Sequence, residues 1–153
     1  MKLKLLSLAI ALTFLFSCNP KAKTDDQAMD IKGTWQLITG TTITKGVSVV
    51  TDYTKNQKFL KIRNDTHFAF FTHNLNTPKD STNHFDAGGG AYTFTGDKYT
   101  EHLDFYSDKN WEGKSFDFTI TFKNDTLIQT GLEKVEKENI NRTIIEKYVK
   151  VKQ

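Results

Sequence analysis

The sequence predicts an all-β fold, an eight-stranded antiparallel up-and-down barrel that follows an N-terminal signal segment. Three observations predict it: side chains alternate with a period of two, three short connections have hairpin-turn chemistry, and long and short connections alternate along the chain. The clearest strand is 116–122 (FDFTITF), in which apolar and polar side chains alternate without exception. One face of that strand is therefore apolar and the other polar, as in a half-buried antiparallel strand.

Three short connections place Asn or Gly beside Asp between apolar runs. They are 63–66 (RNDT), 95–98 (TGDK) and 123–126 (KNDT). Asn and Gly tolerate a positive φ, and Asn and Asp side chains can bond to their own backbone, so these residues suit tight turns. We therefore expect three β-hairpins.

These turns and the alternation delimit the strands of the predicted barrel. The expected strands are 33–43, 57–63, 66–74, 89–95, 98–106, 115–123, 126–131 and 142–151. The long connections are 44–56, 75–88, 107–114 and 132–141, and the last of these contains the one segment suited to a helical turn. Successive connections of a meander lie at opposite ends, so all long connections should gather at one end. Eight strands suffice to close a barrel and remove both sheet edges; a two-sheet sandwich is the alternative.

The first 18 residues have the pattern of a bacterial secretion signal. Lys2 and Lys4 are followed by the apolar run 5–16, which ends before Cys18. The run is too short to span a bilayer, which takes about 20 apolar residues. Cys18 is the only cysteine of the chain, and the segment resembles a lipoprotein signal peptide with Cys18 as the lipidated residue. The alternative is an ordinary secreted protein that is cleaved before Cys18 and keeps a free thiol.

This interpretation divides the chain into a signal peptide at 1–17, a lipidated N-terminus with a flexible tether at 18–31, and a barrel domain at 32–153. A lipid on Cys18 would make the membrane a partner and hold the domain in the bacterial cell envelope. Asn19 is not the Asp that retains some lipoproteins at the inner membrane, which favours the outer membrane. Loss of the two lysines of the signal lowers the formal charge from +3 to +1, so no nucleic-acid partner is expected.

The motif Gly33-Thr34-Trp35 opens the first expected strand and resembles the signature of lipocalins. The resemblance implies that Trp35 plugs the closed end of the barrel and is covered by a cation of the last strand. Lys150 is the best match to that cation. Lys in place of the usual Arg departs from the pattern, because an ammonium group cannot stack as a planar guanidinium does.

More specifically, residues 31–151 resemble a family of small bacterial lipocalin-like lipoproteins whose role is unassigned. The matching strings are 66–70 (THFAF), 88–92 (GGGAY), 99–102 (YTEH), 113–115 (GKS) and 129–131 (QTG). The resemblance implies the fold and brings no established activity.

Glu101 is the most informative interior candidate. It shares one strand face with Tyr99 and Leu103, so an interior aromatic face would carry its carboxylate into the barrel. A carboxylate there needs a partner, and the expected partners are Tyr148, Lys150 or Arg142. It could instead orient a polar ligand group or act as a general base. The candidate ligand-binding residues are Tyr99, Glu101, Leu103, Trp111, Phe116, Phe118 and Tyr148.

The glycine run and the histidines are not expected to form a cofactor or metal site. The run 88–90 precedes a strand, so it indicates a bend or a close backbone approach and not a phosphate-binding loop. His67 and His73 share a strand face but lie roughly 20 Å apart, too far to bind one metal. We therefore expect no cofactor and no metal.

Three functions fit these observations. The leading hypothesis is a membrane-anchored protein that binds a small apolar or amphipathic ligand in or at the mouth of the barrel. The second is a structural or interaction lipoprotein whose barrel is fully packed. The third, less favoured, is an isomerase or cyclase that uses Glu101 as its base; no catalytic residue is assigned. The oligomeric state and the ligand's identity are not predicted.

Overall fold

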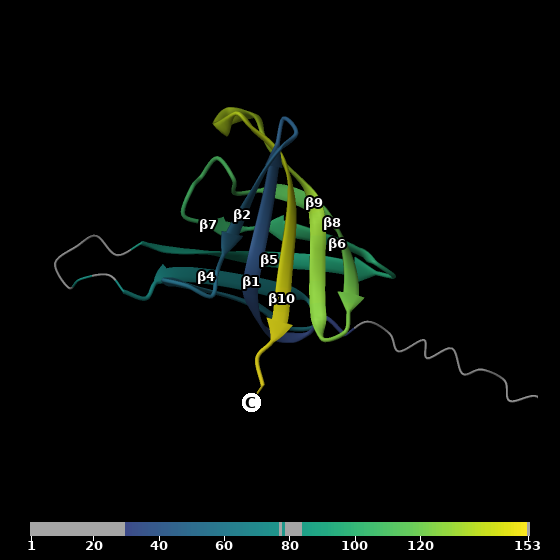
Figure 1. The fold of residues 1–153 in the computed structure, drawn as a ribbon. Helices are drawn as coiled ribbons and strands as arrows, with labels where there is room; N and C mark the ends of the chain where they lie inside the picture. The colour runs from purple at the N-terminus through teal and green to yellow at the C-terminus, as the bar shows by residue number, and fades with distance from the viewer. Residues whose placement is uncertain (1–29, 77, 79–83, 153) are drawn as a thin grey trace, which may run out of the picture.

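The computed structural model describes residues 30–76, 78 and 84–152, and in this part of the chain ten strands form one antiparallel sheet (Figure 1). The strands are β1 (Gly33–Thr44), β2 (Val47–Asp52), β3 (Gln57–Arg63), β4 (His67–Asn74), β5 (Phe85–Thr95), β6 (Lys98–Leu103), β7 (Phe105–Tyr106), β8 (Lys114–Lys123), β9 (Thr126–Val135) and β10 (Ile140–Lys150). A single 3₁₀ turn, η1 (Glu136–Glu138), is the only helical element in these residues.

The sheet closes on itself. The strand order is β10-β9-β8-β6-β5-β4-β3-β1-β2, and β1 also pairs with β10 from Trp35↔Lys150 to Ile43↔Thr143. Eight of the strands therefore follow one another around the ring. The other two are extra partners: β2 pairs with β1, and β7 pairs with β5. The predicted fold, a closed eight-stranded antiparallel barrel, is confirmed.

The prediction of a loop over 44–56 was wrong in part, because β2 occupies its middle. Thr39–Thr44 of β1 pairs with Val47–Asp52, while Gly33–Gln36 pairs with β3. The turn uses Lys45 and Gly46, both at positive φ (50° and 80°). Every residue of β2 is exposed, so this strand lacks the apolar alternation that marks a half-buried strand.

Two other boundaries also differ from prediction. β9 runs on to Val135 and β10 begins at Ile140, so only the 3₁₀ turn remains of the long connection expected at 132–141. The expected strand 98–106 breaks at Asp104, whose carboxylate accepts a hydrogen bond from the Ala91 backbone N–H at 3.1 Å. This break lets β7 pair separately with β5.

The tight turns lie at one end of the barrel, and they use the predicted chemistry. In the β3–β4 turn, Asn64 Oδ1 accepts backbone hydrogen bonds from Thr66 (2.9 Å) and His67 (2.7 Å). Gly96 and Asn124 have positive φ values of 63° and 54°. The β1–β2 turn and η1 lie together at the other end in Figure 1, away from the C-terminus. This distribution leaves the long connections to surround one mouth.

Trp35 lies at the closed end and is 2% exposed. Its indole N–H donates to the Ile31 carbonyl at 2.8 Å, and the Lys150 ammonium lies 5.5 Å from the ring centroid. Gly33 has a φ of +110°, and a Cβ there would meet the Lys150 side chain at 3.0 Å. Glycine at this position therefore allows both the backbone turn and the passage of Lys150 toward the indole.

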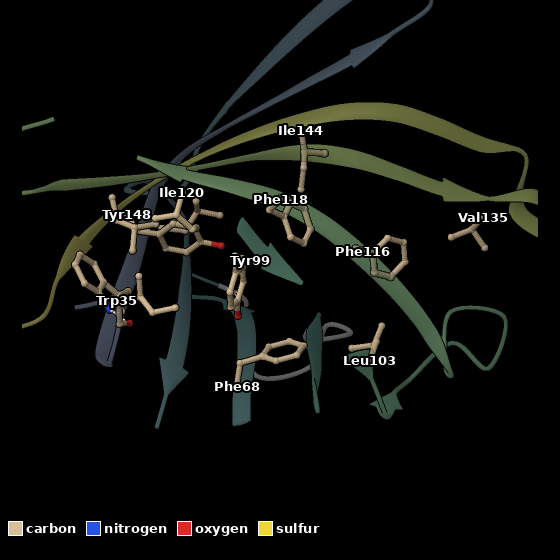
Figure 2. Packing of buried hydrophobic residues seen from close by; sticks show 13 residues of the cluster. Trp35, Phe68, Tyr99, Leu103, Phe116, Phe118, Ile120, Val135, Ile144 and Tyr148 are labelled. Carbon is tan, nitrogen blue, oxygen red and sulfur yellow. Dashed lines mark hydrogen bonds between the residues drawn. The ribbon is translucent and has the colours of Figure 1, made fainter. Parts of the chain in front are cut away.

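The interior is packed near the closed end. Figure 2 shows Trp35, Ile120 and Tyr148 close together, with Phe116 farther along β8 and Phe68 reaching into the interior from β4. Among the residues that the structure describes, four buried polar ones share this interior: Lys61, Arg63, Glu101 and Gln129. In β3 the alternation is reversed from the usual one, since Lys61 and Arg63 are buried while Ile62 is 40% exposed.

Glycines inside the strands permit close approach, as predicted for the run 88–90. A Cβ on Gly90 would collide with the backbone of His102 and Asp104, where β6 departs toward β7. A Cβ on Gly131 would collide with the Phe118 ring, which lies across β9. The glycine run is therefore structural, and it lies within β5 and not at its start.

Candidate ligand cavity at the open end

A cavity of about 300 Å³ opens at the end of the barrel that carries the long connections. Residues in or beside each of these connections line it, including Tyr53, His84, Trp111 and Glu133. Its aromatic wall comprises Tyr53, Phe59, Phe70, Tyr106, Trp111, Phe116 and Phe118. Its polar residues include Gln57, Lys61, Thr72, Glu101, Gln129, Glu133, Arg142 and Glu146. The lining is thus divided between ring faces and charged or amide groups.

The aromatic wall is a chain of ring contacts. Phe59 and Phe70 stack with centroids 5.6 Å apart and nearly parallel planes. Trp111 contacts Tyr106 at 5.9 Å and Phe116 at 5.6 Å. Such packing fixes the rings in place, so the cavity presents preformed apolar faces.

Lys61 and Glu101 form an ion pair at the floor of the cavity. The Lys61 ammonium donates to Glu101 Oε1 at 2.7 Å, and the two side chains are 4% and 8% exposed. Rings of Phe68, Phe70 and Tyr148 surround the ammonium at 5.6–5.9 Å. The expected partners of Glu101 were other residues, and the structure places Lys61 there instead. Pairing and cation–π contact together offset the desolvation of the two charges.

Arg63 lies deeper than Lys61 and bonds to uncharged groups. Its Nε donates to the Tyr99 hydroxyl at 3.1 Å and its Nη2 to Gln129 Oε1 at 2.7 Å. Because the bond from Arg63 fixes Oε1 of the Gln129 amide as the acceptor, Nε2 of that amide points elsewhere. Neither it nor Arg63 Nη1 has a hydrogen-bond partner among the described residues. A buried donor of this kind needs an acceptor from water or from a ligand.

A second ion pair stands higher in the cavity. Arg142 and Glu133 occupy facing positions of β10 and β9, and the guanidinium Nε donates to Glu133 Oε2 at 2.6 Å. The guanidinium carbon also lies 5.8 Å from the Trp111 ring centroid. Arg142 is therefore held between a carboxylate and an aromatic face.

Four carboxylates of the described residues line the cavity, and one of them, Asp86, accepts hydrogen bonds from the Tyr106 and Ser107 hydroxyls. Glu146 differs in its environment from both Glu101 and Glu133. It accepts a hydrogen bond from the Tyr148 hydroxyl at 2.8 Å and forms no ion pair with the described residues. Burial raises the pKa of the Glu146 carboxyl, and the nearby Lys61 charge only partly opposes this. Gln129 faces Glu146 directly across the β9–β10 ladder. A free amide donor and an unpaired carboxyl thus stand side by side in the cavity.

This arrangement can bind a small molecule that has both an apolar body and a polar end. No group of three or more His, Cys, Asp or Glu residues that could hold a metal ion occurs in the part of the chain that the structure describes. The lining residues can offer a ligand hydrogen bonds, charge pairing and aromatic contact.

Comparison with protein families assigns residues 30–153 to a family described as a domain of unknown function. The chain belongs to the DUF4488 family. No curated protein matches this DUF4488 chain.

Solved structures similar to the DUF4488 chain include a lipocalin-like protein from Bacteroides uniformis, at 18% identity and a TM-score of 0.44, covering 78% of this chain and 97% of that one. An uncharacterised protein from Bacteroides eggerthii is similar at 13% identity and a TM-score of 0.43, covering 80% of this chain and 100% of that one.

Five of the seven candidate ligand residues line the cavity of the DUF4488 domain: Glu101, Leu103, Trp111, Phe116 and Phe118. Tyr99 and Tyr148 are fully buried beneath it. The Tyr99 hydroxyl bonds to Arg63, which also lies beneath the lining, and the Tyr148 hydroxyl bonds to Glu146, which is part of the lining.

Sequence reasoning missed Lys61, Gln129, Glu133 and Glu146 as parts of the site. A signal for Glu146 was present: Arg142, Ile144, Glu146, Tyr148 and Lys150 alternate on one face, and Tyr148 was already a candidate ligand-binding residue of the interior. No such signal exists for Lys61, because a charge between Leu60 and Ile62 normally faces solvent in a half-buried strand.

The N-terminal predictions for the DUF4488 chain, a signal peptide at 1–17 and a lipid on Cys18, lie outside the described residues. They stay predictions. Within the described ranges, no helix is long and apolar enough to cross a membrane.

Proposed function

We propose that the barrel binds a small amphipathic molecule in the cavity at its open end. The observation that carries the proposal is the cavity itself, about 300 Å³ and lined both by aromatic rings and by polar groups, some of them without a partner among the described residues. It lies at the low end of the usual range for ligand pockets, roughly 300–1,000 Å³. Since a water takes about 30 Å³, the occupant has on the order of ten non-hydrogen atoms.

The polar groups favour an amphipathic ligand over a purely apolar one. Gln129 Nε2 and Thr72 Oγ1 are buried without a partner among the described residues, and both side chains line the cavity. An apolar occupant would exclude water and leave them unbonded, at a cost of about 1–3 kcal/mol each. A ligand with a polar end avoids this cost.

The alternatives are less well supported. A fully packed barrel would leave no room for a ligand, whereas the open end here encloses one connected space. An isomerase or cyclase with Glu101 as base needs a free carboxylate, and Glu101 already accepts a short bond from Lys61. Ligand binding requires neither a filled barrel nor a free Glu101 carboxylate.

The test is native mass spectrometry of the protein with 2-phenylethanol, backed by titration calorimetry. We expect one molecule bound, with a Kd between roughly micromolar and millimolar for a ligand of this size. Ile144 lines the cavity, so Ile144→Phe should weaken binding at least tenfold by filling the space. Ile62→Phe, the same change on the exposed outer face, is the control and should bind normally. Equal binding by both variants would refute the proposal.

The proposal includes a lipid anchor on Cys18, which would hold this domain at a membrane surface. Each buried methylene contributes about 0.8 kcal/mol, so several acyl chains give stable attachment. The expected result is that the full chain expressed in a bacterium enters the detergent-rich phase on phase separation, and that Cys18→Ser leaves it in the aqueous phase. If both forms partition alike, the anchor is wrong.

A further inference from the structure

The three glutamates of the cavity outnumber the cations available to them. Glu101 is bonded to Lys61 and Glu133 to Arg142, at 2.7 and 2.6 Å. Glu146 forms no ion pair with the described residues, and the hydrogen bond that it accepts comes from the neutral hydroxyl of Tyr148. Arg63 lies beneath the lining and bonds to Tyr99 and Gln129, and its charge acts on Glu101 and not on Glu146.

The surroundings of Glu146 favour a cation. Phe59 contacts Tyr53 and Tyr148 with ring-centroid separations of 5.9 and 6.4 Å, and the Tyr148 hydroxyl donates to Glu146 at 2.8 Å. Burial, and after it the nearby Glu146 charge, raises the pKa of the Tyr53 hydroxyl. Aromatic faces attract a cation in a site shielded from water. Lys61 in the same cavity already shows this mode of contact, with three ring faces around its ammonium.

A second, independent observation indicates that the place next to Glu146 is built for a polar occupant. Gln129 is 0% exposed, lines the cavity, and leaves its amide nitrogen without a partner among residues 30–76, 78 and 84–152. It occupies the position opposite Glu146 on the neighbouring strand. The two groups together offer an acceptor for an ammonium and a donor for an adjacent oxygen or water.

From this geometry we infer that the cavity is selective for a small protonated amine with an aromatic or other apolar body, whose ammonium pairs with the Glu146 carboxylate. The inference rests on the proposed function and names the ligand class for the same site. The ammonium would supply the positive charge that the site lacks, while the body contacts the rings of Phe59 and Phe70. Pairing would also oppose the effect of burial, which raises the pKa of Glu146 in the unliganded protein.

The experiment compares three probes of nearly equal shape: 2-phenylethylamine, 2-phenylethanol and 3-phenylpropanoate. Their affinities are measured by titration calorimetry at pH 7.5 on the unmodified chain, so this arm does not depend on any variant folding. We expect the amine to bind at least tenfold more tightly than the alcohol, and the carboxylate to bind most weakly. Equal affinities, or preference for the carboxylate, would overturn the inference.

The second arm tests whether Glu146 causes the preference for the amine. Glu146→Gln should reduce amine affinity at least tenfold and change alcohol affinity less than twofold. Glu136→Gln is the matched control, because Glu136 is an exposed glutamate of η1 paired with Lys134. An amine preference that survives in Glu146→Gln contradicts the role of Glu146.

The outcomes separate the two levels of the proposal. If the alcohol binds in the cavity and the amine binds no better, only the amine inference fails. If none of the three probes binds at millimolar concentration, the inference and the proposed function both fail.

Discussion

Buried polar side chains such as Glu146 and Gln129 cost folding free energy, and the same side chains can bind a ligand. Their side chains face each other across β9 and β10, inside a barrel whose closed half is filled by apolar packing. A buried carboxyl without a cation is costly in its ionised form. Here the cost is confined to the wall of a cavity, where a ligand can relieve it. The same residue therefore links stability to binding.

That cost gives a prediction about pH. Because the folded-state pKa of Glu146 is raised above its ordinary value of 4.5, folding is penalised once the group ionises. Below about pH 4.5 the group is protonated in both the folded and the unfolded state, and the penalty is absent. The penalty grows as the pH rises from there through the folded-state pKa, by about 1.4 kcal/mol per pH unit, and is constant at higher pH.

We therefore expect Glu146→Gln to gain unfolding free energy relative to the wild type between pH 4.5 and 8, measured by urea unfolding. The groups that act on Glu146 include the Tyr148 hydroxyl, Lys61, Glu101 and Glu133, and all are present in both proteins. The exposed-site variant Glu136→Gln should show no such gain. A constant difference across this pH range would mean that Glu146 is not desolvated.

At the scale of elements, the strands and turns were predicted better from the sequence than the pairing of buried side chains. Turns such as 63–66 and 123–126 were found because Asn, Gly and Asp have a local reason to be there. β2 was missed because all of its residues are exposed, and its pairing with β1 leaves no apolar alternation to detect. The residues that favour a tight turn can be recognised in a sequence. The pairing of a fully exposed strand cannot.

The ion pair of Lys61 and Glu101 illustrates the same limit for the interior. Glu101 was expected inside from the alternation of Tyr99, Glu101 and Leu103, but its partner was not identified. Lys61 belongs to β3, and β4 and β5 separate that strand from β6, which carries Glu101. A pairing across the barrel depends on its closure and register, which no local pattern contains.

This cross-barrel pair gives a prediction about stability. Glu101→Leu or Lys61→Met alone should each cost about 3–5 kcal/mol of unfolding free energy, because each deprives a buried charge of its ion-pair partner. The double variant should lie within about 2 kcal/mol of the wild type, since an apolar pair of similar volume avoids desolvation altogether. Urea unfolding at pH 7 measures all four proteins. Additive costs in the double variant would show that the two charges are not coupled.

At the scale of the whole molecule, the alternation of connection lengths has a functional consequence. Tight turns close one end over Trp35, while the long connections leave room at the other end for a cavity. The outer face offers a competing place for an apolar molecule, because Phe85 and Phe105 are 64% and 70% exposed and flank an open groove along β4, β5 and β7. The two locations lie on opposite sides of the barrel wall.

The most direct test of the account is to locate the bound probe by ¹H–¹⁵N NMR. The chain has two tryptophans: Trp111 lines the cavity, and Trp35 is buried at the closed end. On addition of 2-phenylethanol we predict that the Trp111 indole N–H signal shifts together with cavity residues, while the Trp35 indole signal stays in place. Shifts confined to the outer face around Phe85 and Phe105, or no shifts at all, would contradict the claim that the barrel binds its ligand inside.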